Sequence, residues 1–325
     1  HQPCPGEVWK AGERGAKVWL SRTCPEHGTH EACISSDARF YWLAKGDPAN
    51  ACGPSCACAA DPDGTAGTLG ENADKPGTPE VLSTCLALIE IVDSCNLACP
   101  TCCADSPVGA AGERLKFHPL PELTERIEGV LKRKGGIEIL QLSGGEPTLH
   151  PQFFDLLDWI QDEPRIDYCL LNTNGLRLTK DAEFLAQLGE RARRGNFQLY
   201  LQYDGPQAAG QAALRGTDLR AMKAEVMACC EREGIPFTLA MTVNKDNLPH
   251  LWKTVGVGLE YEFCRGVAFQ PMFGSGRGGD HGERLNTADI ILASVSQSSN
   301  RLRFEDFTPL PCGDPNCATI GYLIR

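Results

Sequence analysis

Six short apolar segments alternate with amphipathic segments of helical length, and this alternation constrains the fold more than any other feature. The apolar segments, which predict strands, span 86–92, 137–142, 167–172, 197–203, 237–243 and 266–271. The segments that predict helices lie near 121–134, 151–162, 181–194, 219–233 and 248–261. Strands separated by helices favour a parallel sheet with right-handed crossovers. We therefore expect an α/β fold, a TIM-like partial barrel of six β/α units, with sites at the carboxyl ends of the strands.

Three further regions are expected around this barrel, which we place at residues 81–280. Residues 1–58 form a head that carries cysteine and histidine but few long apolar runs. Residues 59–80 are rich in Gly, Pro and Asp, which predicts a linker. Residues 281–325 form a C-terminal segment that brings two more cysteines.

Charge and hydropathy exclude some classes of function. The net charge of −11 argues against a protein that binds the phosphate backbone of nucleic acid. We find no run of 18 apolar residues and no signal peptide, so we expect a cytoplasmic protein without a transmembrane segment.

The chain holds 17 cysteines, far more than an average protein. A secreted protein stabilised by disulfides is one explanation. The odd number, the length of the chain and the close spacing of several cysteines favour metal binding instead.

One cysteine group follows the first predicted strand, in the run Cys95-Asn-Leu-Ala-Cys99-Pro-Thr-Cys102. Three close thiolates can bind three irons of a cubane cluster. The fourth iron then has no protein ligand and can bind another molecule. We call Cys95, Cys99 and Cys102 the triad.

The second predicted strand runs into Ser143-Gly144-Gly145-Glu146-Pro147. The glycines allow the backbone to approach a ligand closely. The Glu146 carboxylate can accept a charge-assisted hydrogen bond from an ammonium group. An ordinary turn is the alternative explanation of this segment.

Polar side chains also end the later strands. These candidates for a cofactor or substrate contact are Asn172, Asn174, Gln202, Asp204, Asn244 and Gln270. For the Asn174-Gly175 pair, a turn with positive φ explains the residues equally well.

Together, these motifs resemble the radical S-adenosylmethionine (SAM) superfamily over residues 86–275. The resemblance implies that the triad binds a 4Fe-4S cluster and that its open iron chelates SAM. It also implies that Ser143 to Glu146 and the strand-end residues contact SAM. In this superfamily, SAM is cleaved reductively to a 5′-deoxyadenosyl radical, which abstracts hydrogen from an unactivated sp³ carbon. An electron donor such as ferredoxin or flavodoxin is implied as a partner.

Two cysteine groups outside the predicted barrel suggest an auxiliary cluster. One comprises Cys52, Cys56 and Cys58, and the other comprises Cys312 and Cys317. Disulfides or free thiols are the alternative.

The head carries Cys4 and the run Cys24-Pro-Glu-His27, a spacing suited to a mononuclear zinc or iron site. A loop with scattered cysteine and histidine fits the same residues.

The order of motifs along the whole chain resembles the subgroup of tetraether synthase and the cobalamin-independent (class D) pterin methyltransferases. That resemblance implies carbon–carbon bond formation, either on a lipid chain or by methyl or methylene transfer to a pterin-like small molecule. A peptide-modifying or cofactor-maturing radical SAM enzyme with auxiliary clusters is an alternative. An iron–sulfur electron-transfer protein without radical chemistry is another, and SAM binding would separate it from the enzymes.

Overall fold

The structure is a computed structural model, and the chain divides into two compact units that are described separately. One unit comprises residues 1–84 and 285–325, and the other comprises residues 85–284. The described residues are 4, 6–12, 16–38, 40–41, 86–108, 115–278, 284–309 and 319–323. The expected boundaries at 58, 80 and 280 stay predictions, because residues 42–85 and 279–283 lie outside this set.

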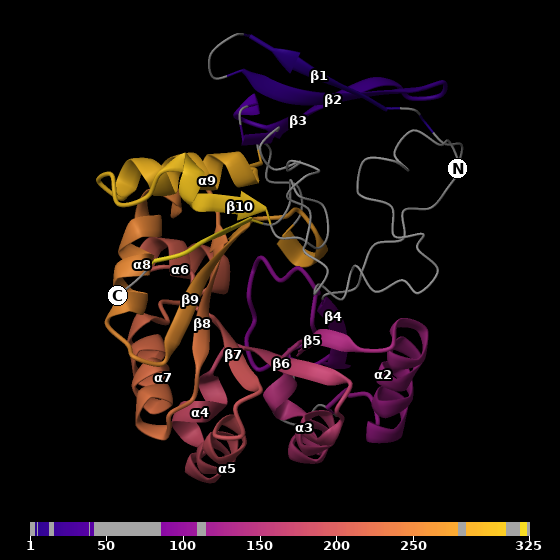
Figure 1. The fold of residues 1–325 in the computed structure, drawn as a ribbon, viewed down its shortest axis with the longest axis vertical. Coiled ribbons are helices and arrows are strands. Elements are labelled where there is room, and N and C mark those ends of the chain that lie inside the picture. Colours follow the sequence, from indigo (N-terminus) through magenta and orange to yellow (C-terminus); the bar gives the residue numbers. More distant parts are fainter. Residues whose placement is uncertain are drawn as a thin grey trace. The chain divides into compact units, whose positions relative to one another are not determined.

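The larger unit is built on a six-stranded parallel sheet in which every strand pairs with the next strand along the chain (Figure 1). The strands are β4 (Leu86–Val92), β5 (Ile137–Gly144), β6 (Ile166–Thr173), β7 (Phe197–Gln202), β8 (Phe237–Val243) and β9 (Cys264–Pro271). The predicted α/β fold is therefore confirmed, and the strand ends shift by no more than two residues from the expected ranges.

Helices connect successive strands, as expected for parallel strands that need crossover connections. They are α2 (Leu120–Lys134), α3 (Phe153–Asp162), α4 (Leu176–Lys180), α5 (Ala182–Ala192), α6 (Ala208–Arg215), α7 (Arg220–Glu233) and α8 (Leu251–Leu259). Local sequence fixes several ends: the Asp181 side chain accepts a hydrogen bond from Phe184 N and begins α5. Gly135 ends α2 with a φ of 82°. The short helices α4 and α6 were not predicted.

Each strand presents one face to the helices and the other to the concave side of the sheet. On β7, Phe197, Leu199 and Leu201 are fully buried toward the helices, whereas the alternating Gln198 and Gln202 are half-buried on the concave face. Because strand residues alternate between faces, the same division holds along β6 and most of β8. The apolar core therefore lies between sheet and helices, and the concave face is left for polar side chains.

The smaller unit contains a three-stranded antiparallel sheet that was not predicted. Its strands are β1 (Gly6–Ala11), β2 (Lys17–Cys24) and β3 (Gly28–Ser35), and the unit also holds α9 (Thr287–Gln297), β10 (Phe307–Pro309) and β11 (Thr319–Gly321). Asn286 caps α9 and accepts hydrogen bonds from the backbone and hydroxyl groups of Ser36. Residues next to α9 thus join the N-terminal sheet in one unit.

No helix in the described ranges combines the length and the apolar character that crossing a bilayer requires.

Candidate active site at the carboxyl ends of the strands

The triad lies on a loop, residues 93–108, that leaves the carboxyl end of β4. Each of the three thiols has a hydrogen-bond donor beside it. Leu97 N donates to Cys95 Sγ at 3.4 Å, and Ser106 N donates to Cys102 Sγ at 3.5 Å. The third thiol, Cys99, is contacted by the guanidinium of Arg215. Such donors stabilise thiolates, the form that binds iron.

Binding of a cluster by the triad stays a prediction. Within the described ranges, no three His, Cys, Asp or Glu side chains converge on one metal ion. In a cubane cluster each cysteine binds a different iron, so the thiols need not converge. Burial raises the pKa of Cys95 to about 11, so iron binding must displace a proton from this thiol. Cys103, the next cysteine along the chain, is exposed.

The two glycines at the end of β5, Gly144 and Gly145, approach the start of the triad loop. Gly145 N donates to Val92 O at 2.6 Å, and Glu146 N donates to Ser94 O at 3.0 Å. A Cβ on Gly144 would clash with Val92 O, and a Cβ on Gly145 would clash with Ser94 O. Only glycine therefore lets the end of β5 run this close to the residues that precede Cys95.

Glu146 is 1% exposed, and its carboxylate ties the ends of β5 and β6 together. Its Oε1 accepts from the hydroxyls of Thr148 at 2.6 Å and Thr173 at 2.7 Å. Its Oε2 accepts from Asn174 N at 2.8 Å. A carboxylate has about four lone-pair sites, so Oε2 can still accept from a bound ammonium. The contact with the SAM amine stays a prediction.

The other strand-end amides form a network on the concave face. Gln141 donates to Asn172 Oδ1, and Asn172 Nδ2 donates to Ser143 Oγ at 3.1 Å. Asn174 Nδ2 donates to the side chain of Asn96, the residue after Cys95, at 2.7 Å. Asn172, Asn174 and Ser143, all expected from the sequence, thus lie together, and Asn174 reaches the triad loop.

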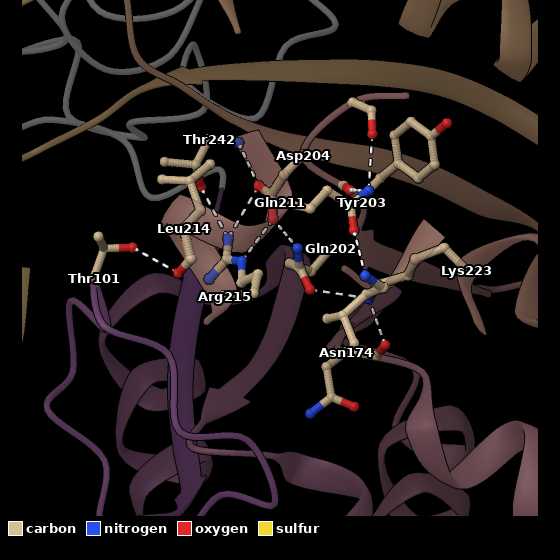
Figure 2. Close-up of polar contacts among 12 residues, drawn as sticks. Thr101, Asn174, Gln202, Tyr203, Asp204, Gln211, Leu214, Arg215, Lys223 and Thr242 are labelled. Carbon is tan, nitrogen blue, oxygen red and sulfur yellow. Dashed lines mark hydrogen bonds and ion pairs between the residues drawn. The ribbon is translucent and has the colours of Figure 1, made fainter. Parts of the chain in front are cut away.

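Asp204 does not offer a free carboxylate, because it forms a buried ion pair with Arg215 (Figure 2). Asp204 is fully buried with a φ of 63°, and its oxygens lie 2.6 Å from Arg215 Nε and 3.0 Å from a terminal nitrogen of the same guanidinium. Gln202 also donates to Asp204, and Thr242 N donates to it at 3.0 Å. Asp204 therefore holds Arg215 in place at the end of α6.

The end of α6 also binds the triad loop. Thr101, between Cys99 and Cys102, donates its hydroxyl to Leu214 O at 3.0 Å (Figure 2). Together with the contact between Arg215 and Cys99, this places a guanidinium beside the triad. Sequence reasoning missed Arg215, because α6 itself was not predicted.

Sequence reasoning also missed Lys223, whose side chain is as fully buried as the apolar residues of the core. Its ammonium donates to Asn174 O at 2.6 Å and to Gln202 Oε1 at 2.9 Å, and burial lowers its pKa to about 7 (Figure 2). Its spacing from the buried Val226, Met227 and Cys230 places it on the apolar face of α7. A lysine on the apolar face of a predicted helix is the sequence signal that could have identified Lys223.

The remaining candidates are less closely connected to this network. Asn244 Oδ1 accepts from the backbone of Asp246 and Asn247, as in an Asx turn. Gln270 is exposed on β9, paired in register with Thr242. The auxiliary-cluster candidates Cys52, Cys56, Cys58, Cys312 and Cys317 lie outside the described residues.

In the head, Cys24 Sγ lies 3.2 Å from His27 Nδ1, and the Cys4 thiol is a further neighbour of Cys24. The hydrogen bond with His27 lowers the pKa of Cys24 to about 7. Within the described residues these predicted ligands form no group of three that could hold a metal ion, so the metal site in the head stays a prediction.

Comparison with known proteins identifies the family. Residues 89–256, just over half of the chain, match the model of the radical SAM superfamily. The chain belongs to the radical SAM superfamily. The resemblance inferred from the motifs is thus confirmed, and membership implies a 4Fe-4S cluster and SAM as cofactors. Residues 1–36 match the HMPTM N-terminal zinc ribbon domain, which is consistent with a metal in the head.

Two relatives of this radical SAM chain differ in how much of its sequence they match. It is 25% identical over 324 residues to 7,8-dihydro-6-hydroxymethylpterin dimethyltransferase of Methanocaldococcus jannaschii, covering 93% of the chain and 58% of the relative. It is 27% identical over 181 residues to GTP 3′,8-cyclase of Shewanella denitrificans, covering 53% of the chain and 51% of the relative. The chain therefore spans less than two thirds of the length of either relative.

Solved radical SAM structures share the fold. A radical SAM methyltransferase from Sphaerobacter thermophilus aligns with a TM-score of 0.50 at 11% identity, covering 92% of this chain and 75% of that one. SuiB from Streptococcus suis, bound to S-adenosylmethionine, aligns with a TM-score of 0.50 at 16% identity, covering 67% of this chain and 44% of that one.

Proposed function

We propose that this radical SAM enzyme forms a carbon–carbon bond by transferring a one-carbon unit to a pterin-like ring. The observation that carries the proposal is the polar lining of the concave face, and the match to a pterin dimethyltransferase along 93% of the chain supports it. The bound cluster and SAM would supply the 5′-deoxyadenosyl radical. The protein would hold the substrate and exclude water.

The concave face of β5 to β8 is lined mostly by hydrogen-bonding side chains, with the apolar Ile139, Leu170 and Ala240 between them. The hydrogen-bonding side chains are Gln141, Ser143, Tyr168, Asn172, Gln198, Tyr200, Gln202, Thr238 and Thr242. Neighbours on this face bond across strands: Gln198 donates to Thr238 at 2.6 Å, and Tyr168 donates to Gln198 at 3.4 Å. This shared bonding shows that they point to the same side of the sheet.

Such a lining supports a heterocyclic substrate over a lipid chain. Hydrocarbon cannot pair with the donors and acceptors that these side chains leave free after bonding one another, and each group that is left unpaired costs about 1–3 kcal/mol. A pterin ring presents N–H donors, ring nitrogens and a carbonyl along its edge, and amide side chains can pair with all of these. The lipid-coupling alternative has no comparable support from this face.

Two charged groups beside the triad are suited to the amino-acid part of SAM. The Arg215 guanidinium, which contacts Cys99, can donate to a carboxylate. The Glu146 carboxylate can accept from an ammonium through Oε2. Because Asp204 fixes Arg215 and donors from three residues fix Glu146, neither group has to be ordered when SAM binds.

The other metal centres are part of the proposal. We place a zinc ion in the head, with Cys4, Cys24 and His27 among its ligands. We place an auxiliary cluster at Cys52, Cys56, Cys58, Cys312 and Cys317. A ferredoxin or flavodoxin would supply the electron.

The test is an anaerobic turnover assay with reconstituted protein, SAM and a strong reductant. The substrate is 7,8-dihydro-6-hydroxymethylpterin, with a methylene-carrying folate as carbon donor. We expect mass spectrometry to detect 5′-deoxyadenosine together with a methylated pterin. Alanine at Cys95, Cys99 and Cys102 should abolish both products, and Cys103→Ala should keep both. Formation of 5′-deoxyadenosine without any modified pterin would reject the substrate class while leaving SAM cleavage intact.

A further inference from the structure

The segment that follows the last strand of the sheet lies against the loop that follows the first. Residues 275–278 come after β9, and the backbone nitrogen of Arg277 donates to Cys102 O at 2.9 Å. The two segments belong to the same compact unit. The end of β9 thus reaches a ligand residue of the triad.

The Arg277 side chain makes three further contacts with this loop. Its guanidinium donates to Cys99 O at 3.1 Å and to Ser106 O at 2.6 Å, and it forms an ion pair with Asp105 at 3.0 Å. One arginine therefore binds both sides of the turn that contains Cys102. A guanidinium has five N–H donors in a fixed plane, which suits it to several acceptors at once.

Gly276 lets the backbone approach this closely. Its φ is +60°, and a Cβ at this position would clash with the carbonyl oxygens of Cys102 and Cys103. Asp105, the carboxylate partner of Arg277, also has a positive φ, of 46°. The contact is thus built from two unusual backbone conformations that face each other.

We propose that Gly276 and Arg277 form a clasp that positions the triad loop for the cluster, so that Arg277 is a positioning residue of the radical SAM site. The clasp fixes residues 102–106 and with them the Ser106 N–H that donates to Cys102 Sγ. The inference depends on cluster binding by the triad, and it is independent of the pterin substrate.

The clasp has a consequence beyond stability. Hydrogen bonds to cysteine sulfurs help set the reduction potential of an iron–sulfur cluster. Partners outside the ligand set commonly change metal affinity by about 10- to 100-fold when they are removed. Loss of Arg277 should therefore change the electronic properties of the cluster as well as its retention.

The test compares Arg277→Ala with Arg265→Ala, which removes an exposed arginine near the start of β9. Each reconstituted protein is examined by chelator competition for iron, by redox titration and by the electron paramagnetic resonance spectrum of the reduced cluster with and without SAM. We expect Arg277→Ala to lose its iron at a chelator concentration at least about 10-fold below the one that the wild type requires. It should also show a shifted reduction potential and an altered spectrum. Arg265→Ala should match the wild type.

One further variant and a chemical rescue distinguish loss of the clasp from loss of folding. Arg277→Lys retains the positive charge but not the planar fork, so we expect it to resemble Arg277→Ala in spectrum while folding normally. Methylguanidinium, well below denaturing concentrations, should restore the spectrum of Arg277→Ala. The proposal is overturned if Arg277→Lys and folded Arg277→Ala both keep the iron retention, reduction potential and spectrum of the wild type. Failure of the wild type itself to bind a cluster at the triad would instead reject the assignment of the site.

Discussion

Lys223 shows how a buried cation can be positioned without a carboxylate in direct contact. Its ammonium bonds a backbone carbonyl at the end of β6 and the Gln202 amide at the end of β7. Both acceptors are neutral, so burial dominates and lowers the pKa of Lys223 to about 7. The charged form of Lys223 is therefore less stable in the fold than in water.

This pKa predicts a specific dependence of stability on pH. In the unfolded chain Lys223 has its ordinary pKa near 10.5, so between about pH 7 and 10 the unfolded state binds more protons than the folded state. The unfolding free energy should thus rise with pH across this interval through Lys223. We expect the unfolding free energy of the wild type minus that of Lys223→Met to rise by about 3 kcal/mol from pH 6.5 to 9.5, in anaerobic urea titrations.

The matched control is Lys253→Met, at an exposed position on α8. Its difference from the wild type should stay constant over the same range. A constant difference for Lys223→Met as well would mean that Lys223 has an ordinary pKa in the folded protein.

At the residue scale, sequence reasoning identified the site residues that lie in short motifs and missed those whose contacts form only in the folded chain. The triad and Gly144-Gly145-Glu146 are contiguous motifs, so they are readable without a fold. Arg215 and Arg277 acquire their contacts only when α6 and the end of β9 are brought to the triad loop. No local sequence pattern around either arginine predicts its contact with the triad loop.

At the element scale, the six strands and five longer helices were predictable because each has an apolar face of clear period. Helix α6 has mainly alanine, glycine and glutamine with Leu214 as its single large apolar residue, so it carries little periodic signal. Strand β1 is exposed along nearly its whole length, which removes the alternation that marks a strand. These elements are specified by tertiary contacts more than by their own sequence.

The junction between β5 and the triad loop gives a prediction at this scale. A Cβ at Gly145 would clash with Ser94 O, a backbone atom that moves only with the whole loop. We expect Gly145→Ala to weaken SAM binding at least about 10-fold, because small displacements of a positioned site cost this much or more. The measurement is a calorimetric or spectroscopic titration of the reconstituted protein with SAM.

Gly129→Ala in α2 is the control, since a Cβ there meets only the far end of the Arg133 side chain. Alanine should stabilise that helix by up to about 1 kcal/mol and leave SAM affinity unchanged. Wild-type SAM affinity in Gly145→Ala would show that the loop adapts to the side chain.

At the scale of the whole molecule, the chain combines a radical SAM barrel with a unit that joins its N-terminal sheet to α9. The pairing of residues near 40 with residues near 290 could not be predicted, because no local pattern links segments so far apart. The cysteine groups at 52–58 and 312–317 lie outside the described residues, and their proposed role is to hold a metal centre in addition to the triad.

Metal analysis of the whole protein tests that role. We expect anaerobically reconstituted wild type to contain about eight irons per chain and the triple alanine variant of the triad about four, one cubane cluster fewer. Zinc should be present at about one per chain and should fall in Cys24→Ser. If the triad variant contained no iron, the proposal of an auxiliary cluster would be rejected.

The clasp also bears on the order in which the enzyme is made. Each strand of the sheet pairs with the one synthesised just before it, so the sheet can grow as the chain leaves the ribosome. The triad loop is among the first parts of this unit to emerge, yet its side-chain contacts with Arg277 span 171 to 178 residues. The cluster loop therefore reaches its final shape only after the last strand has been translated. Iron delivered to the nascent chain would meet cysteines that are not yet held, and maturation is expected to follow synthesis of the entire barrel.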